Sequence, residues 1–132
     1  MNAQRSSDSV PVSSWRSARL FVTDEFAAPP VILRVNDSVI GTLGNFSAST
    51  GKAKSKKTFN VCAIVAAAMT GGTVLNYSAS LPPEKRRILY VDTEQSRFHC
   101  KRVLCRILRL AGLPADVHPP LLEFLCLRGY AT

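Results

Sequence analysis

The stretch that decides the fold reads Gly44-Asn-Phe-Ser-Ala-Ser-Thr-Gly-Lys-Ala-Lys-Ser-Lys-Lys-Thr-Phe59 and continues into an apolar run over residues 60–69. A polar segment leads into a glycine, four lysines follow within seven residues, and a threonine stands just before the apolar run. This order is typical of a phosphate-binding loop, in which backbone N–H groups and a lysine meet the anion and a hydroxyl reaches Mg²⁺. The helix that follows points its positive end at the same phosphates.

The usual pattern of such a loop is a glycine, four residues and then Gly-Lys-Ser/Thr. A register that begins at Gly51 keeps the first glycine, Lys57 as the lysine and Thr58 as the hydroxyl, but it places Lys56 where the second glycine belongs. If that position requires a positive φ, a side chain there is strained by roughly 1 kcal/mol or more. In this register, we expect the nucleotide to be bound by Gly51, Ser55, Lys56, Lys57, Thr58 and Phe59. Thr58 is also expected to hold the metal.

Two alternatives compete with this interpretation. A register built on Gly44 and Gly51 has a loop two residues too long, and Ala53 follows its lysine where a hydroxyl is needed. A lysine run can also be a solvated segment that binds nucleic acid or acts as a targeting signal. The net charge of +8, from 17 basic and nine acidic residues, indicates a polyanionic partner in either case.

The four cysteines show no paired C-x-x-C spacing. Cys62 and Cys126 lie inside apolar runs and are expected in the core. His99, Cys100 and Cys105 lack further ligands at a spacing suited to a structural metal. Reduced thiols in a cytoplasmic protein fit this pattern better than a disulfide framework.

No membrane segment is expected. Residues 1–8 carry no apolar core of a signal peptide, and the longest apolar run, Val61–Met69, falls short of the ~20 residues that span a bilayer. We expect a cytoplasmic protein with a mobile, serine-rich arm over residues 1–18 and one domain over residues 19–132.

The first half of the domain is predicted to hold a hairpin, a strand and a helix. The runs 31–35 and 38–43 flank Asn36-Asp37, a favourable hairpin turn. A strand near 43–49 should deliver the phosphate loop, and Thr58 to Met69 should form a helix that is buried all round. Residues 78–87 should form an exposed connection.

The second half reads as strand, helix and strand. The apolar run Ile88–Val91 is typical of a buried parallel strand, and it ends in Asp92-Thr93-Glu94. Apolar residues at helical spacing predict a helix over 96–111, and the run 121–127 reads as a further strand. This alternation predicts an α/β fold with a mostly parallel sheet and right-handed crossovers. Ligands bind at the carboxyl ends of such strands. The loop over residues 51–58, here called the lysine loop, should therefore lie at the same edge of the sheet as Asp92 and Glu94.

The segments 41–59 and 89–96 together resemble RecA-like P-loop ATPases, in particular the replicative-helicase or RepA-like ATPases of bacterial mobile elements. The resemblance covers about residues 29–128 and implies a partial RecA-like P-loop fold, with a mostly parallel sheet, flanking helices and an N-terminal hairpin. It implies ATP and Mg²⁺ as ligands, with a Walker A lysine at Lys57 and a metal-binding hydroxyl at Thr58. It also implies that Glu94 orients the attacking water, whereas a simpler reading of Glu94 is the acidic first turn of a helix.

In that family a later strand ends in an aspartate that holds the metal's water, and an arginine often comes from a neighbouring subunit. Neither has a candidate after Leu127. The resemblance therefore implies the N-terminal part of a DNA-replication or mobilisation ATPase, with weak or absent hydrolysis, DNA as partner in the full-length context, and a ring of identical subunits if completed.

The other function is a small basic DNA- or RNA-binding module without nucleotide chemistry. Its expected footprint consists of basic residues from the lysine loop and from the helix 96–111, namely Lys52, Lys54, Lys56, Arg97, Lys101, Arg102, Arg106 and Arg109.

Overall fold

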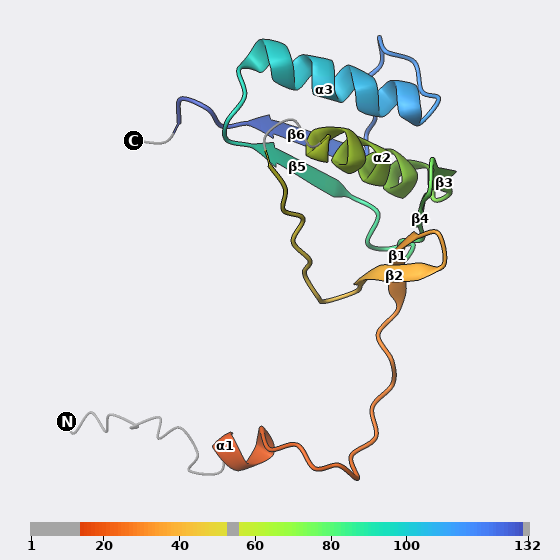
Figure 1. Ribbon diagram of the computed structural model, residues 1–132, viewed down its shortest axis with the longest axis vertical. Helices are drawn as coiled ribbons and strands as arrows, with labels where there is room; N and C mark the ends of the chain where they lie inside the picture. The colour runs from red at the N-terminus through yellow and green to blue at the C-terminus, as the bar shows by residue number, and fades with distance from the viewer. Residues whose placement is uncertain (1–13, 53–55, 131–132) are drawn as a thin grey trace, which may run out of the picture.

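The computed structural model describes residues 14–52 and 56–130. Residues 14–30 run away from the rest of the chain, with the short helix α1 (Ser14–Ser17) at the far end of this arm (Figure 1). The side chains of residues 15–30 are exposed, including Trp15. Most of the expected arm, residues 1–13, lies outside the described residues.

Four strands form an antiparallel sheet in the order β2-β1-β4-β3. Strands β1 (Val31–Val35) and β2 (Ser38–Thr42) make the predicted hairpin, and Asn36 takes a left-handed φ of 48° in its turn. Strands β3 (Thr73–Val74) and β4 (Tyr77–Ala79) form a second, shorter hairpin. The two hairpins join where β4 pairs antiparallel with β1.

A separate pair of strands, β5 (Ile88–Asp92) and β6 (Leu122–Cys126), is parallel. The helix α3 (Arg97–Leu110) connects them, as parallel neighbours require a crossover. Tyr90 of β5 pairs with Phe124 of β6, and their rings stack with centroids 4.4 Å apart. These two strands and the connecting helix confirm the elements predicted over 88–91, 96–111 and 121–127. The expected burial of the first strand is wrong, because Leu89 and Val91 are 61% and 44% exposed.

The helix α2 (Lys57–Thr70) lies between the two sheets and contacts β3, β4, β5 and α3 (Figure 1). Because it has almost no polar surface beyond its first turn, it has to be covered on several sides. Its buried residues Cys62, Val65 and Ala66 pack in one cluster with Val103, Ile107 and Leu122. The predicted buried helix is therefore confirmed, and it ends at Gly71, whose left-handed φ of 66° suits glycine.

The predicted mostly parallel sheet is wrong, because only β5 and β6 are parallel and the larger sheet is antiparallel. Residues 43–50 form no strand: Gly44 turns the chain with a φ of 83°, and Phe46 lies in solvent. Residues 78 and 79, expected in a connection, belong to β4, which occupies the edge of β1. The short turn between β3 and β4 gives antiparallel pairing of these two strands, and β4 then also pairs antiparallel with β1.

Within residues 14–52 and 56–130, no helix has the length and apolar character that crossing a membrane requires. The longest described helices, α2 and α3, each have 14 residues.

The core cluster predicts the effect of a truncation at its centre. Ile107 is fully buried, so Ile107→Ala should lower the free energy of unfolding by about 2–5 kcal/mol through lost contacts and a cavity. Urea denaturation followed by circular dichroism measures this change. Arg109→Ala, two positions further along the same helix but exposed, should stay within about 0.5 kcal/mol of the native chain. A small effect of Ile107→Ala would contradict the packing described here.

Candidate anion site at the start of α2

The first turn of α2 carries positive charge where a helix already has a positive end. Lys56 is the N-cap and Lys57 the first helical residue, and no acidic residue lies in the first turn. The Lys56 side chain makes no capping hydrogen bond, so it satisfies none of the free N–H groups. Cations at this end are unfavourable unless an anion neutralises them, because the helix dipole has the same sign there. The start of α2 is therefore suited to an anion.

Lys56 adopts the left-handed conformation, with φ 60° and ψ 19°. This is the position at which the usual phosphate-loop pattern has its second glycine. The positive φ confirms the strain expected for a side chain at this point, and it supports the register that begins at Gly51.

The two described ends of the lysine loop lie close together. The Lys57 Nζ donates a hydrogen bond to the Gly51 carbonyl oxygen, so the lysine side chain reaches back to the first residue of the loop. Thr58 is half-buried in the first turn of α2, and Phe59 beside it is exposed. Ser55, also expected to bind the nucleotide, and Lys54 lie outside the described residues.

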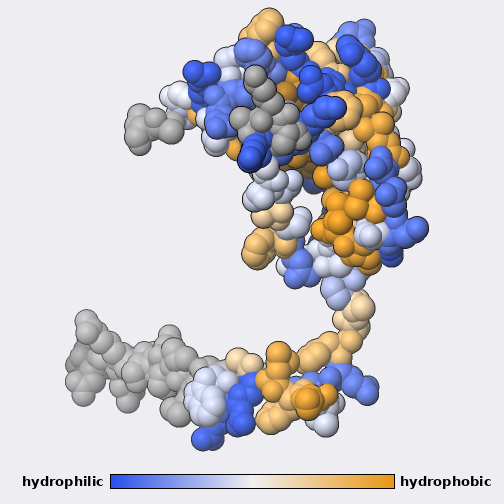
Figure 2. Space-filling model, viewed as in Figure 1, coloured by the Kyte–Doolittle hydropathy of each residue, from blue (hydrophilic) through white to orange (hydrophobic). Residues whose placement is uncertain are grey.

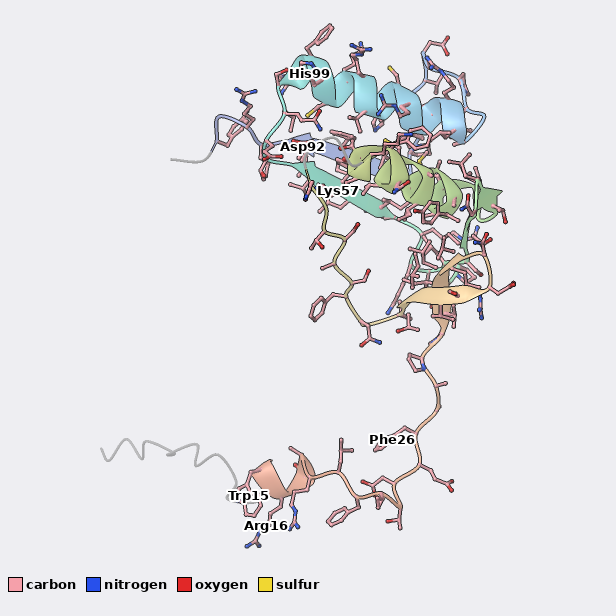
Figure 3. All side chains as sticks on the ribbon, viewed as in Figure 1. Trp15, Arg16, Phe26, Lys57, Asp92 and His99 are labelled. Atoms are coloured by element: carbon pink, nitrogen blue, oxygen red, sulfur yellow. The ribbon has the colours of Figure 1, made fainter. Side chains whose placement is uncertain are left out.

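The carboxyl end of β5 lies at the same end of the molecule as the start of α2, and Figure 3 shows Lys57 and Asp92 there. The helix α2 contacts β5 directly. The expected shared edge between the lysine loop and the acidic end of this strand is thus present, although only two of the strands are parallel.

Asp92 is the buried carboxylate of this edge and was not among the predicted site residues. Its Oδ1 accepts the backbone N–H groups of Glu94 and Gln95 at 3.0 and 2.7 Å, and its Oδ2 accepts the Gln95 side-chain amide at 2.8 Å. Burial opposes ionisation of Asp92, but these three hydrogen bonds outweigh it and lower the pKa of the carboxyl group. Asp92 is therefore an anion that shapes the turn after β5.

Gln95 links this turn to β6 and α3. Its carbonyl oxygen accepts hydrogen bonds from the thiols of Cys126 at 3.4 Å and Cys100 at 3.8 Å. Burial and the neighbouring Cys126 raise the pKa of Cys100 to about 11, so the Cys100 thiol acts here as a neutral donor. No described set of three or more His, Cys, Asp or Glu side chains could hold a metal ion.

Glu94 lies in the turn, with its side chain exposed and its backbone N–H bound to Asp92. The helix α3 begins only at Arg97, after Ser96 as N-cap, and no acidic residue lies in its first turn. The simpler reading of Glu94 as part of that first turn is therefore wrong. The Glu94 carboxylate lies in the turn that follows the carboxyl end of β5, and the N-cap of α3 is Ser96.

Sequence reasoning placed Asp92 and Glu94 at this edge, but it did not predict that Asp92 and Gln95 hold the turn together. The available signal was the position of Asp92 at the end of an apolar strand, directly before a short polar turn. No protein-family model, protein of known function or solved structure matches this chain.

The strain at Lys56 predicts a stabilising substitution. Lys56→Gly should raise the free energy of unfolding by about 1 kcal/mol, because glycine adopts the left-handed conformation without a steric penalty. Gly71→Ala is the matched control and should lower the free energy of unfolding, because alanine is strained at the φ of 66°. An added Cβ at this position meets no atom within 4 Å, so the backbone conformation alone causes the effect. Both changes are measured by urea denaturation. Destabilisation by Lys56→Gly would show that this backbone conformation is wrong.

The hydrogen bonds of Asp92 predict a pH-dependent effect of Asp92→Asn. Because folding lowers the Asp92 pKa, the stabilisation from the carboxylate is full above the unfolded pKa of about 3.9 and is lost as the pH falls through the folded value. At pH 7 the variant should be less stable by about 2 kcal/mol. In urea denaturation from pH 7 to pH 3, this difference should shrink below pH 4. A difference that stays constant across the series would contradict the assignment.

Proposed function

We propose that the chain binds the phosphates of a nucleoside triphosphate, ATP, at the start of α2. The observation that carries the proposal is the N-terminus of a buried helix whose N-cap, the left-handed Lys56, makes no side-chain capping hydrogen bond and stands beside a second lysine, Lys57. Free N–H groups and the positive end of the dipole favour a phosphate at such a point. The sequence resemblance to RecA-like ATPases over 41–59 and 89–96 supports the choice of ATP among phosphate ligands.

The residues at this position fit a phosphate group. Lys56 and Lys57 supply charge, and a left-handed residue next to helical ones turns successive N–H groups toward one point. The Lys57 Nζ bonds a loop carbonyl, a contact that it can exchange for a phosphate oxygen. Phe59 is exposed beside this turn.

Thr58 is the residue that would hold Mg²⁺, since its hydroxyl lies in the first helical turn beside Lys57. Bound Mg²⁺ supplies charge neutralisation on the phosphates. Asp92 keeps its negative charge and fixes the turn that carries Glu94. In the proposed function Glu94 orients a water molecule near the terminal phosphate, a contribution typically of about 10²–10⁴-fold in rate.

Calorimetric titration with MgATP tests the binding site. Lys57→Ala should weaken binding about tenfold or more, because a charge-assisted hydrogen bond to phosphate is lost. Lys85→Ala, which removes an exposed lysine outside the loop, is the matched control and should leave the affinity unchanged. Lys56→Gly should bind as tightly as the native chain or more tightly. Equal losses from Lys52→Ala and Lys57→Ala would overturn the register, and absence of any binding would overturn the proposal.

A further inference from the structure

A second feature of the molecule lies along α3, where an open groove of about 750 Å³ runs between this helix and β6. Its lining combines three cations of α3 with two phenylalanines and a histidine: Arg97, Lys101, Arg102, Phe98, Phe124 and His118. Figure 2 shows hydrophilic side chains gathered along α3 at the top of the molecule.

The charge of α3 is one-sided. Residues 97–110 contain five basic side chains and no acidic one, so no carboxylate of the helix itself neutralises them. Arg106 is half-buried and lies beside the Cys62 thiol, where it opposes the pKa increase that burial causes. Arg97, Lys101 and Arg102 are exposed and line the groove. The groove is therefore complementary to a polyanion.

Aromatic rings stand among these charges, which the sequence alone did not indicate. Phe98 is 68% exposed, and its ring meets that of His99 edge-on, with ring centroids 5.4 Å apart. Phe124 comes from β6 and is fixed by stacking on Tyr90. An exposed ring beside arginine and lysine is the arrangement on which bases of a single strand stack.

We propose that this groove binds single-stranded nucleic acid, with phosphates on Arg97, Lys101 and Arg102 and a base on Phe98. A duplex would present its phosphates but keep its base faces stacked inside, and so would leave Phe98 without a partner. An acidic peptide would likewise meet the cations alone. The inference rests on the groove and goes beyond the proposed nucleotide site.

Fluorescence anisotropy with a labelled oligothymidylate, and with an oligouridylate in parallel, tests this binding on the full chain. With three phosphate contacts, the logarithm of the affinity should fall with the logarithm of salt concentration with a slope of about −2. Phe98→Ala should weaken binding about tenfold, since one stacking contact is lost. Lys101→Ala should weaken binding and reduce the slope by about 0.7. Tight binding of either oligonucleotide with these changes supports the proposal.

Arg109→Ala is the matched control, because it removes an exposed cation of the same helix that does not line the groove. It should reduce the affinity far less than Lys101→Ala. Circular dichroism verifies that each variant is folded, as expected for exposed positions. Absence of binding at low salt, equal losses from Arg109→Ala and Lys101→Ala, no loss from Phe98→Ala, or equally tight binding of a duplex would each overturn the proposal.

Discussion

The apolar surface of α2 is the constraint on which the rest of this structure depends. From Val61 to Met69 the helix offers no charged side chain, so every direction around it has to be filled by other parts of the chain. The second hairpin and β5 cover some directions, and α3 covers another through Val103 and Ile107. Since both sheets pack on this one helix, its burial joins them and directs its first turn toward the carboxyl end of β5 (Figure 1).

Local patterns in the sequence were sufficient for most of the elements. The predicted hairpin, helix and two later strands are all present. They were indicated by the Asn36-Asp37 turn, by the helical periodicity over 96–111, and by the apolar runs before Asp92 and at 121–127. These features depend on near neighbours in the chain, which a sequence displays directly. The sheet was predicted wrongly because strand pairing depends on distant residues. Nothing near Val31–Val35 in the sequence indicates that this strand pairs with Tyr77–Ala79.

For the candidate site too, most of the features that depend on near neighbours in the sequence were predicted, and those that depend on distant residues were not. The order of glycine, lysines and threonine identified the start of α2. Because Lys56 stands where the usual pattern has a glycine, the sequence also indicated the left-handed backbone conformation found at Lys56. The hydrogen bonds of Asp92 to Glu94 and Gln95 are also local, whereas the link from the Gln95 carbonyl to the Cys126 thiol was not predictable, since that thiol lies on another strand. The groove along α3 was missed for the same reason, because Phe98 and Phe124 come together only when β6 packs beside the helix. The start of α2 and the turn after Asp92 thus depend on near neighbours in the chain, whereas the groove is a product of tertiary packing.

The central claim is that the first turn of α2, behind the left-handed Lys56, is an anion site. The most direct measurement is a two-dimensional ¹⁵N–¹H NMR titration of the full chain with pyrophosphate, which follows each backbone amide separately. Direct binding predicts that the amides of Lys56, Lys57 and Thr58 shift first and saturate together, because their N–H groups lie at the free helix end. The account is contradicted if these amides stay unchanged, or if the shifts are confined to the basic side of α3.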